Sequence, residues 1–103
     1  MTTSKQKAVG SAAERQVAQL VGGVRVGMDG GPVDVIVAGY MNVQVKNVKT
    51  LPSLAGVARM IDLMPDDVLR AVVVIERAGK GRRGVRTITF DLDAWVEWHG
   101  SRD

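Results

Sequence analysis

VDVIVAGYMNVQVKNV, residues 33–48, is the stretch that decides the fold of this chain. Two runs rich in β-branched residues, 33–38 and 43–48, flank a short segment that contains Gly39, and this pattern predicts two strands joined by a hairpin turn. In the second run, valines alternate with polar side chains. Because successive side chains of a strand point to opposite faces, Gln44 and Lys46 are expected on one face and the valines on the other.

The remaining sequence predicts helices and further strands on either side of this hairpin, in the order α-β-β-β-α-β-β-α. The expected elements are a flexible lead-in over residues 1–10, a helix capped by Ser11 and ended by Gly22, a strand at 24–26, a helix capped by Thr50, strands at 70–77 and 85–90, and a helix capped by Asp91 and ended by Gly100. The fold class expected is therefore α/β, a mixed five-stranded sheet flanked by helices.

Composition narrows the classes of function. A chain of 103 residues with 46% hydrophobic residues supports one folded domain and excludes a mainly disordered chain. It contains no Cys, which removes disulfides, thiolate zinc sites and a Cys nucleophile. The N-terminal segment carries Lys5 and Lys7 and no hydrophobic signal core, so a cytoplasmic location is expected. The net charge of +3 and the basic cluster around residues 80–86 fit a polyanionic partner.

Two carboxylates stand where apolar residues are expected. Glu14 shares a helical stripe with Val17, Ala18 and Val21, and a carboxylate facing a core needs an ion, a partner or a proton. Its alternative role is to complete a capping box with Ser11. Asp34 opens an otherwise aliphatic strand, although Asp is depleted in strands, and its alternative role is that of a turn residue.

Gln44 and Lys46 taken singly could be the solvent-facing side of an ordinary strand. Taken together with Asp34 and Glu14, they can surround one point with hard oxygens and one ammonium. Hard oxygens suit Mg²⁺ or Mn²⁺, and an ammonium beside a metal suits hydrolysis of a phosphodiester.

This convergence requires one strand register. Asp34, Gln44 and Lys46 share a face only when the numbers of paired residues have an even sum. We expect Asp34 opposite Lys46 and residue 36 opposite Gln44, with residues 39–41 as a three-residue or bulged turn. A two-residue turn at Gly39 and Tyr40 would direct Asp34 away from the other two side chains.

At these residues the chain resembles the PD-(D/E)xK nuclease superfamily, and within it most the Holliday-junction resolvases. The segments that carry the resemblance are KAVGSAAER (7–15), PVDVIV (32–37) and VQVKN (43–47). The resemblance implies a restriction-endonuclease-like αβββαβ core. It also implies a homodimer that uses Mg²⁺, which Mn²⁺ can replace, to cut branched DNA during recombination.

Site roles follow from the resemblance position by position. Glu14 is similar to the family's helix acid, Asp34 to its metal-binding aspartate and Lys46 to its catalytic lysine. Gln44 stands where the family usually has a second strand carboxylate, which removes one negative charge. The Val45 carbonyl is a further expected metal ligand, and Asp29 is a candidate substitute acid.

Basic side chains outside this set are candidate DNA contacts. They are Lys5, Lys7, Arg15, Arg25 and Lys49 around the expected site, and Lys80, Arg82 and Arg83 in the glycine-rich loop. For the loop residues, a solvated hairpin tip is the alternative. For the whole chain, the alternatives to a junction resolvase are a non-catalytic DNA-binding module of the same fold and a nuclease acting on other DNA.

Overall fold

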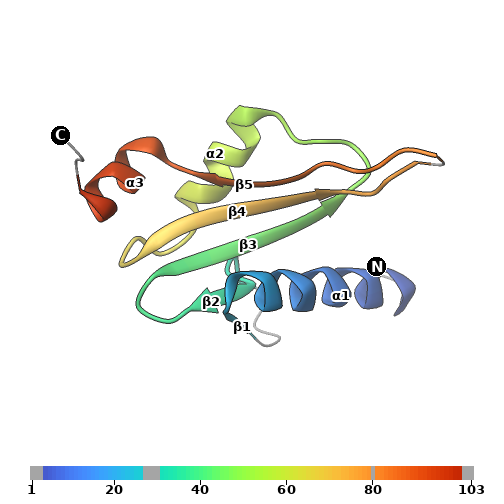
Figure 1. The fold of residues 1–103 in the computed structure, drawn as a ribbon, viewed down its shortest axis with the longest axis horizontal. Coiled ribbons are helices and arrows are strands. Elements are labelled where there is room, and N and C mark those ends of the chain that lie inside the picture. Colours follow the sequence, from blue (N-terminus) through green and yellow to red (C-terminus); the bar gives the residue numbers. More distant parts are fainter. Residues whose placement is uncertain (1–3, 27–30, 80, 101–103) are drawn as a thin grey trace.

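The computed structural model describes residues 4–26, 31–79 and 81–100, with residues 4–11 described as backbone only. It is an α/β fold built on one five-stranded sheet in the order β1-β2-β3-β4-β5 (Figure 1). The expected fold class and the αβββαβ order of its first six elements are confirmed. Among the described helices, none has the length and apolar character needed to cross a membrane.

The sheet is mixed because one connection crosses over. β1 (Val24–Arg25), β2 (Val35–Val37) and β3 (Met41–Val48) are antiparallel neighbours. β4 (Leu69–Glu76) runs parallel to β3, since α2 (Leu54–Asp62) carries the chain back, and β5 (Arg86–Phe90) returns antiparallel to β4. A parallel pair needs such a crossover helix.

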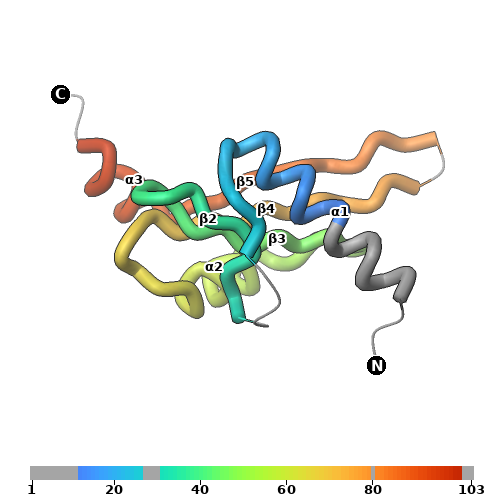
Figure 2. The backbone as a smooth tube through the Cα atoms, turned by 90° about the horizontal axis from the view of Figure 1, so that it is seen from below, coloured from blue at the N-terminus to red at the C-terminus, as the bar shows by residue number. Residues whose placement is uncertain are grey.

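Helices cover both faces of the sheet. α1 (Ser4–Val21) packs on one face and α2 on the other, and the view along the sheet separates them clearly (Figure 2). The alternation of side chains along β3 and β4 divides the apolar residues between two clusters. The α1 cluster contains Val17, Ala18, Val35, Met41, Val43, Leu69, Ala71 and Val73, and the α2 cluster contains Val57, Ile61, Met64, Val72 and Val74.

Two expected helix starts are wrong. α1 begins at Ser4, so Ser11 lies inside the helix and is not its cap. Residues 4–10 include good helix formers such as Lys5 and Lys7, so the helix extends into the segment expected as a lead-in. α2 is capped by Ser53, whose hydroxyl accepts a hydrogen bond from the Gly56 N–H at 3.0 Å, and not by Thr50. The proline at position 52 disfavours helical backbone in the residue before it, which moves the start past Thr50.

The last helix, α3 (Leu92–His99), has the predicted ends. The Asp91 carboxylate accepts from the Ala94 N–H at 2.9 Å, and Gly100 ends the helix with a φ of 77°. His99 links this helix to the β2–β3 turn through a 3.0 Å hydrogen bond between its Nε2 and the Tyr40 hydroxyl. The aromatic side chains therefore collect at one end of the sheet.

Candidate active site

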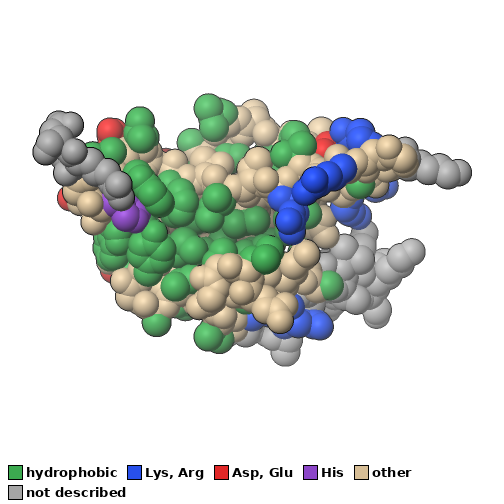
Figure 3. All heavy atoms as spheres, in the orientation of Figure 1, with side chains coloured by type: hydrophobic (Ala, Val, Ile, Leu, Met, Phe, Trp, Pro, Cys, Tyr) green, Lys and Arg blue, Asp and Glu red, His purple; other side chains and the backbone are tan. Residues whose placement is uncertain are grey.

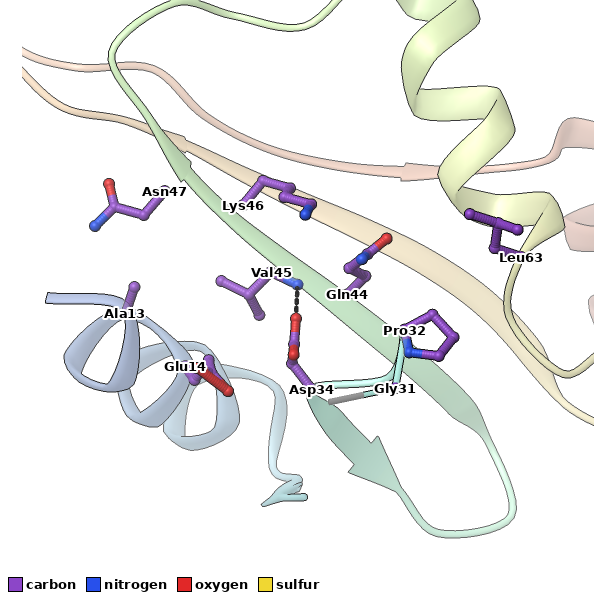
Figure 4. Close-up of a pocket in the computed structure, with 10 residues that line it drawn as sticks. All are labelled: Ala13, Glu14, Gly31, Pro32, Asp34, Gln44, Val45, Lys46, Asn47 and Leu63. Carbon is purple, nitrogen blue, oxygen red and sulfur yellow. Dashed lines mark hydrogen bonds between the residues drawn. The ribbon is translucent and has the colours of Figure 1, made fainter. Parts of the chain in front are cut away.

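A pocket of about 570 Å³ lies where β3 continues beyond its antiparallel partner β2 (Figure 4). β2 pairs only with the first three residues of β3, so the rest of that strand has an open edge on this side. The pocket reaches around this edge, because its lining includes residues of α1 from one face and of α2's end from the other. The lining residues are Ala13, Glu14, Gly31, Pro32, Asp34, Gln44, Val45, Lys46, Asn47 and Leu63.

The hairpin has an even pairing sum, as the site requires, but not the expected register. Val35 pairs with Val43 and Val37 pairs with Met41, so the numbers sum to 78 and Asp34 does not lie opposite Lys46. The turn contains three residues, 38–40, one position earlier than expected, and a hydrogen bond from the Tyr40 N–H to the Val37 carbonyl closes it. Gly39 supplies the φ of 70° that this turn needs.

Asp34 reaches the site through a local distortion of β2. Its N–H donates to the Val43 carbonyl at 2.8 Å, although the ladder pairs Val43 with Val35. Two residues thus oppose one, as in a β-bulge, a device that redirects a side chain at the end of a pairing. The Asp34 carboxylate then accepts a 2.8 Å hydrogen bond from the Val45 N–H, in the position a longer β2 would have filled.

Gln44 and Lys46 project together from β3. Their parallel neighbours on β4 are Val72 and Val74, which belong to the α2 cluster, so both polar side chains lie on that face of the sheet. Figure 4 shows the two side chains extending from β3 on the same side, above Asp34. The Gln44 Oε1 is buried and has no hydrogen-bond partner among the described residues. An unpaired buried acceptor is unfavourable by about 1–3 kcal/mol, so an incoming donor or cation would be stabilised there.

Glu14 enters the pocket from α1, on the opposite face. Its side chain is half-buried, and its Oε1 lies 3.5 Å from the Arg25 Nε in an ion pair. The capping role considered for Glu14 is ruled out, because it lies in the third turn of α1. The pairing with Arg25 supplies the partner that a carboxylate on this stripe requires.

The Val45 carbonyl faces the same edge as the Asp34 carboxylate. In a strand, the N–H and C=O of one residue point to the same side, and the Val45 N–H points to Asp34. The backbone at Val45 thus adds a hard oxygen at the edge where the carboxylate lies.

Asn47 is a lining residue to which the sequence analysis gave no role. Its Oδ1 is buried and without a partner in the described structure, and the side chain lies beside Ala13 on the α1 side of the pocket (Figure 4). The sequence contains an indication of this position, because Asn is depleted in strands and Asn47 directly follows Lys46.

The oxygen donors are of the kind that Mg²⁺ prefers: two carboxylates, one carboxamide and one backbone carbonyl. They include only two acids, and within the described ranges no group of three or more His, Cys, Asp or Glu side chains is placed to hold a metal. Asp29, the candidate substitute acid, lies outside the described residues. The donor set fits a hard divalent ion in chemistry, with one negative charge fewer than a three-carboxylate site.

The expected DNA contacts divide into several groups. Arg15, Lys49 and Arg83 are exposed. Arg25 is engaged by Glu14, and Arg82 forms a 3.0 Å ion pair with Glu76. The side chains of Lys5 and Lys7, and Lys80 as a whole, lie outside the described part of the chain. Comparison of the chain with protein-family models, with curated proteins and with solved structures found no significant match.

Proposed function

We propose that this protein is a metal-dependent DNA endonuclease that hydrolyses phosphodiester bonds in the pocket at the open edge of β3. The observation that carries the proposal is that Asp34, Gln44 and Lys46 line one pocket despite the shifted register. A carboxylate, a buried unpaired oxygen and an ammonium form the set of groups that phosphodiester hydrolysis with a divalent ion requires.

Each residue of the pocket would have a role that follows from its chemistry. Asp34, Gln44 and the Val45 carbonyl would hold Mg²⁺ or Mn²⁺, with Glu14 as a further ligand when it is released from Arg25. When bound, the ion supplies positive charge at the scissile phosphate and makes water more acidic. The Lys46 ammonium stabilises the negative charge that develops on the phosphate oxygens, and it orients the attacking water.

A four-way DNA junction is the substrate proposed for this pocket, with a homodimer as the cutting unit. A symmetric junction needs two cuts, and a two-fold dimer supplies two equivalent sites. A cytoplasmic location accords with such a substrate.

Two features support a second candidate, a DNA-binding module of the same fold that does not cut. The amide at Gln44 lowers the negative charge available to a metal. The ion pair between Arg25 and Glu14 engages a second of the expected ligands, the Glu14 carboxylate. Both features weaken metal binding, while Arg15, Lys49 and Arg83 stay exposed for contacts with phosphates.

The deciding experiment compares a labelled four-way junction with a linear duplex of the same arms, in Mg²⁺, Mn²⁺ or EDTA. Metal-dependent nicking of the junction that is lost in Lys46→Ala, while the gel shift remains, supports the proposal. A salt-sensitive gel shift without nicking in any metal overturns it in favour of the binding module. Nicking of flaps or duplex in preference to the junction retains the nuclease and replaces its substrate.

A further inference from the structure

β5 is an edge strand whose outer side has no partner among the described residues. The sheet ends at β5, and the Glu76 N–H donates to the Val85 carbonyl at 2.8 Å, which fixes the alternation of the pairing. Thr87 and Thr89 therefore direct their backbone groups to β4, whereas Arg86, Ile88 and Phe90 direct theirs outward. The outer edge presents a row of unpaired N–H and C=O groups.

Edge strands are usually protected against pairing with another chain by proline, by several charges or by a covering segment. β5, of sequence RTITF, contains no proline and a single charge. Within the described chain, no strand pairs with the outer side of β5, and α3 (Leu92–His99) follows the end of this strand (Figure 1). The edge of β5 is thus suited to pairing with a further strand.

The face beside this edge is apolar. Ile88 is 46% exposed, and it borders a groove between α1 and β5 that also includes Leu20, Val73 and Ile75. Trp95 on α3 is 38% exposed and packs against Phe90, with ring centroids 4.9 Å apart. Figure 3 shows hydrophobic side chains gathered on this face between α3 and the β4–β5 hairpin.

The charges along the edge favour a second copy of this chain as the occupant. Arg83 and Arg86 lie at the hairpin end of β5, whereas Asp91 and Asp93 lie at its other end, where α3 begins. Antiparallel pairing of β5 with itself about Ile88 places Arg86 opposite the partner's Phe90. The same rotation places the basic hairpin end of one copy at the end of β5 where the partner's Asp91 and the partner's Asp93 lie, and symmetry repeats the attraction. Nucleic acid is disfavoured as the occupant, because its phosphates would be repelled at the acidic end of β5.

We infer that β5 of one copy pairs antiparallel with β5 of a second copy, about a two-fold axis through Ile88, and forms a continuous ten-stranded sheet. This names the interface of the homodimer proposed above, and it does not depend on whether the pocket cuts DNA. Because the axis is perpendicular to the sheet, equivalent faces of the two copies point to the same side. Measured across the strands, the two β3 strands would lie about 24 Å apart, at a spacing of about 4.8 Å per strand.

A proline at position 88 tests the backbone pairing. The Ile88 N–H points away from β4, so Ile88→Pro removes an outward donor and leaves the ladder to β4 intact, as proline on an edge strand does. By sedimentation equilibrium, the wild type is expected to be a dimer, and Ile88→Val as the matched control should stay one. Ile88→Pro should shift the population to monomer by at least tenfold in dissociation constant. A monomeric wild type at all concentrations tested overturns the inference.

Cysteine pairing tests the geometry even if the proline variant fails to fold. The chain contains no Cys, so Ile88→Cys introduces a single thiol. Directly opposed residues of a hydrogen-bonded antiparallel pair have Cα atoms about 5.5 Å apart, within disulfide range. Ile88→Cys should oxidise to a covalent dimer, and Leu54→Cys, at a position 77% exposed on α2, should not. Equal cross-linking of the two variants overturns the inference.

A charge exchange tests the occupant. Arg83→Glu and Asp93→Lys should each weaken the dimer, and the double variant should restore it, because positions 83 and 93 flank opposite ends of β5 within one copy and neighbouring ends across the axis. Additive weakening in the double variant overturns the register. All these measurements use protein without DNA or metal, so a failure of the interface is distinct from a failure of the nuclease.

Discussion

The carboxylate of Asp34 accepts a 2.8 Å hydrogen bond from the backbone N–H of Val45, and so stands in for backbone of β2, which pairs with β3 only as far as Val43. One oxygen, Oδ2, completes the edge of β3, and the other can bind a cation. Asp34 therefore has a structural role and a chemical role, and different substitutions can separate them.

Asp34→Asn keeps an oxygen that can accept from Val45 but removes the charge, whereas Asp34→Ala removes both. We expect both variants to lose cleavage. Asp34→Asn should lower the free energy of unfolding by less than about 1 kcal/mol, and Asp34→Ala by about 1–2 kcal/mol, because a hydrogen bond to a charged acceptor is lost. Urea unfolding and junction nicking measure the two effects. Full activity in Asp34→Asn would contradict the metal role.

Gln44→Glu restores a carboxylate at the position where the chain has an amide. We expect it to tighten Mg²⁺ binding about tenfold, since affinity follows the charge of the ligand set. Without metal, a buried carboxylate should lower the melting temperature, because its charge is desolvated. Melting curves with and without Mg²⁺ check both, with Gln44→Ala as control. An equal Mg²⁺ effect on the wild type and Gln44→Glu would place the metal elsewhere.

DNA affinity should depend on salt through the exposed basic residues and not through the paired ones. Arg15→Ala and Lys49→Ala should each reduce the log–log salt slope by about 0.9, the value per phosphate contact. Arg82→Ala should leave the slope unchanged, because Arg82 is already paired with Glu76. Titrations of a fluorescent junction at several salt concentrations measure the slopes. A larger loss in Arg82→Ala than in Lys49→Ala would reverse the assignment.

Glu76 makes the stem of the β4–β5 hairpin sensitive to acid. Hydrogen bonds from the Val85 N–H and from Arg82 lower the pKa of the Glu76 carboxyl from its ordinary value. A lowered pKa in the folded state stabilises the stem at pH values above the unfolded pKa. This stabilisation disappears as the pH falls through the folded pKa. The protection factor of the Val85 amide, which is the ratio of its intrinsic to its observed exchange rate, should therefore fall in acid, and Glu76→Gln should remove that dependence.

The hairpin stem also requires glycine at position 84. A Cβ on Gly84 would overlap the carbonyl oxygen of Glu76. Gly84→Ala should consequently open the stem at every pH, whereas Gly79→Ala, where nothing lies within 4 Å, should leave it intact. If the loss of protection in acid persists in Glu76→Gln, a group other than Glu76 causes the pH dependence of the hairpin stem.

The sequence predicted the elements whose signals are local and strong. Asp91 caps α3 as predicted, and the β-branched run of β4 is a buried strand as expected. The cap of α2 was misplaced because Thr50 and Ser53 are chemically similar, and only the effect of the intervening proline separates them. A local sequence pattern does not distinguish well between two candidate N-caps that lie so close together.

The sequence indicated residues that line one pocket of the structure, but not how their side chains are arranged there. The hairpin has the even pairing sum that was expected, but the bulge at Asp34, which turns its carboxylate to the Val45 N–H, leaves no mark in the sequence pattern. The ion pair between Glu14 and Arg25 was also missed, because β1 has only two residues and its packing against α1 is a long-range contact. Periodicity describes one element at a time and does not report such contacts.

Both tryptophans of the chain, Trp95 and Trp98, lie in α3. Trp95 stacks on Phe90, the last residue of the open edge strand, while neither tryptophan lines the pocket at Asp34. Intrinsic tryptophan fluorescence should therefore report self-association without a label but not Mg²⁺ binding. Its emission should shift when two copies associate and stay constant when Mg²⁺ is added to the assembled protein.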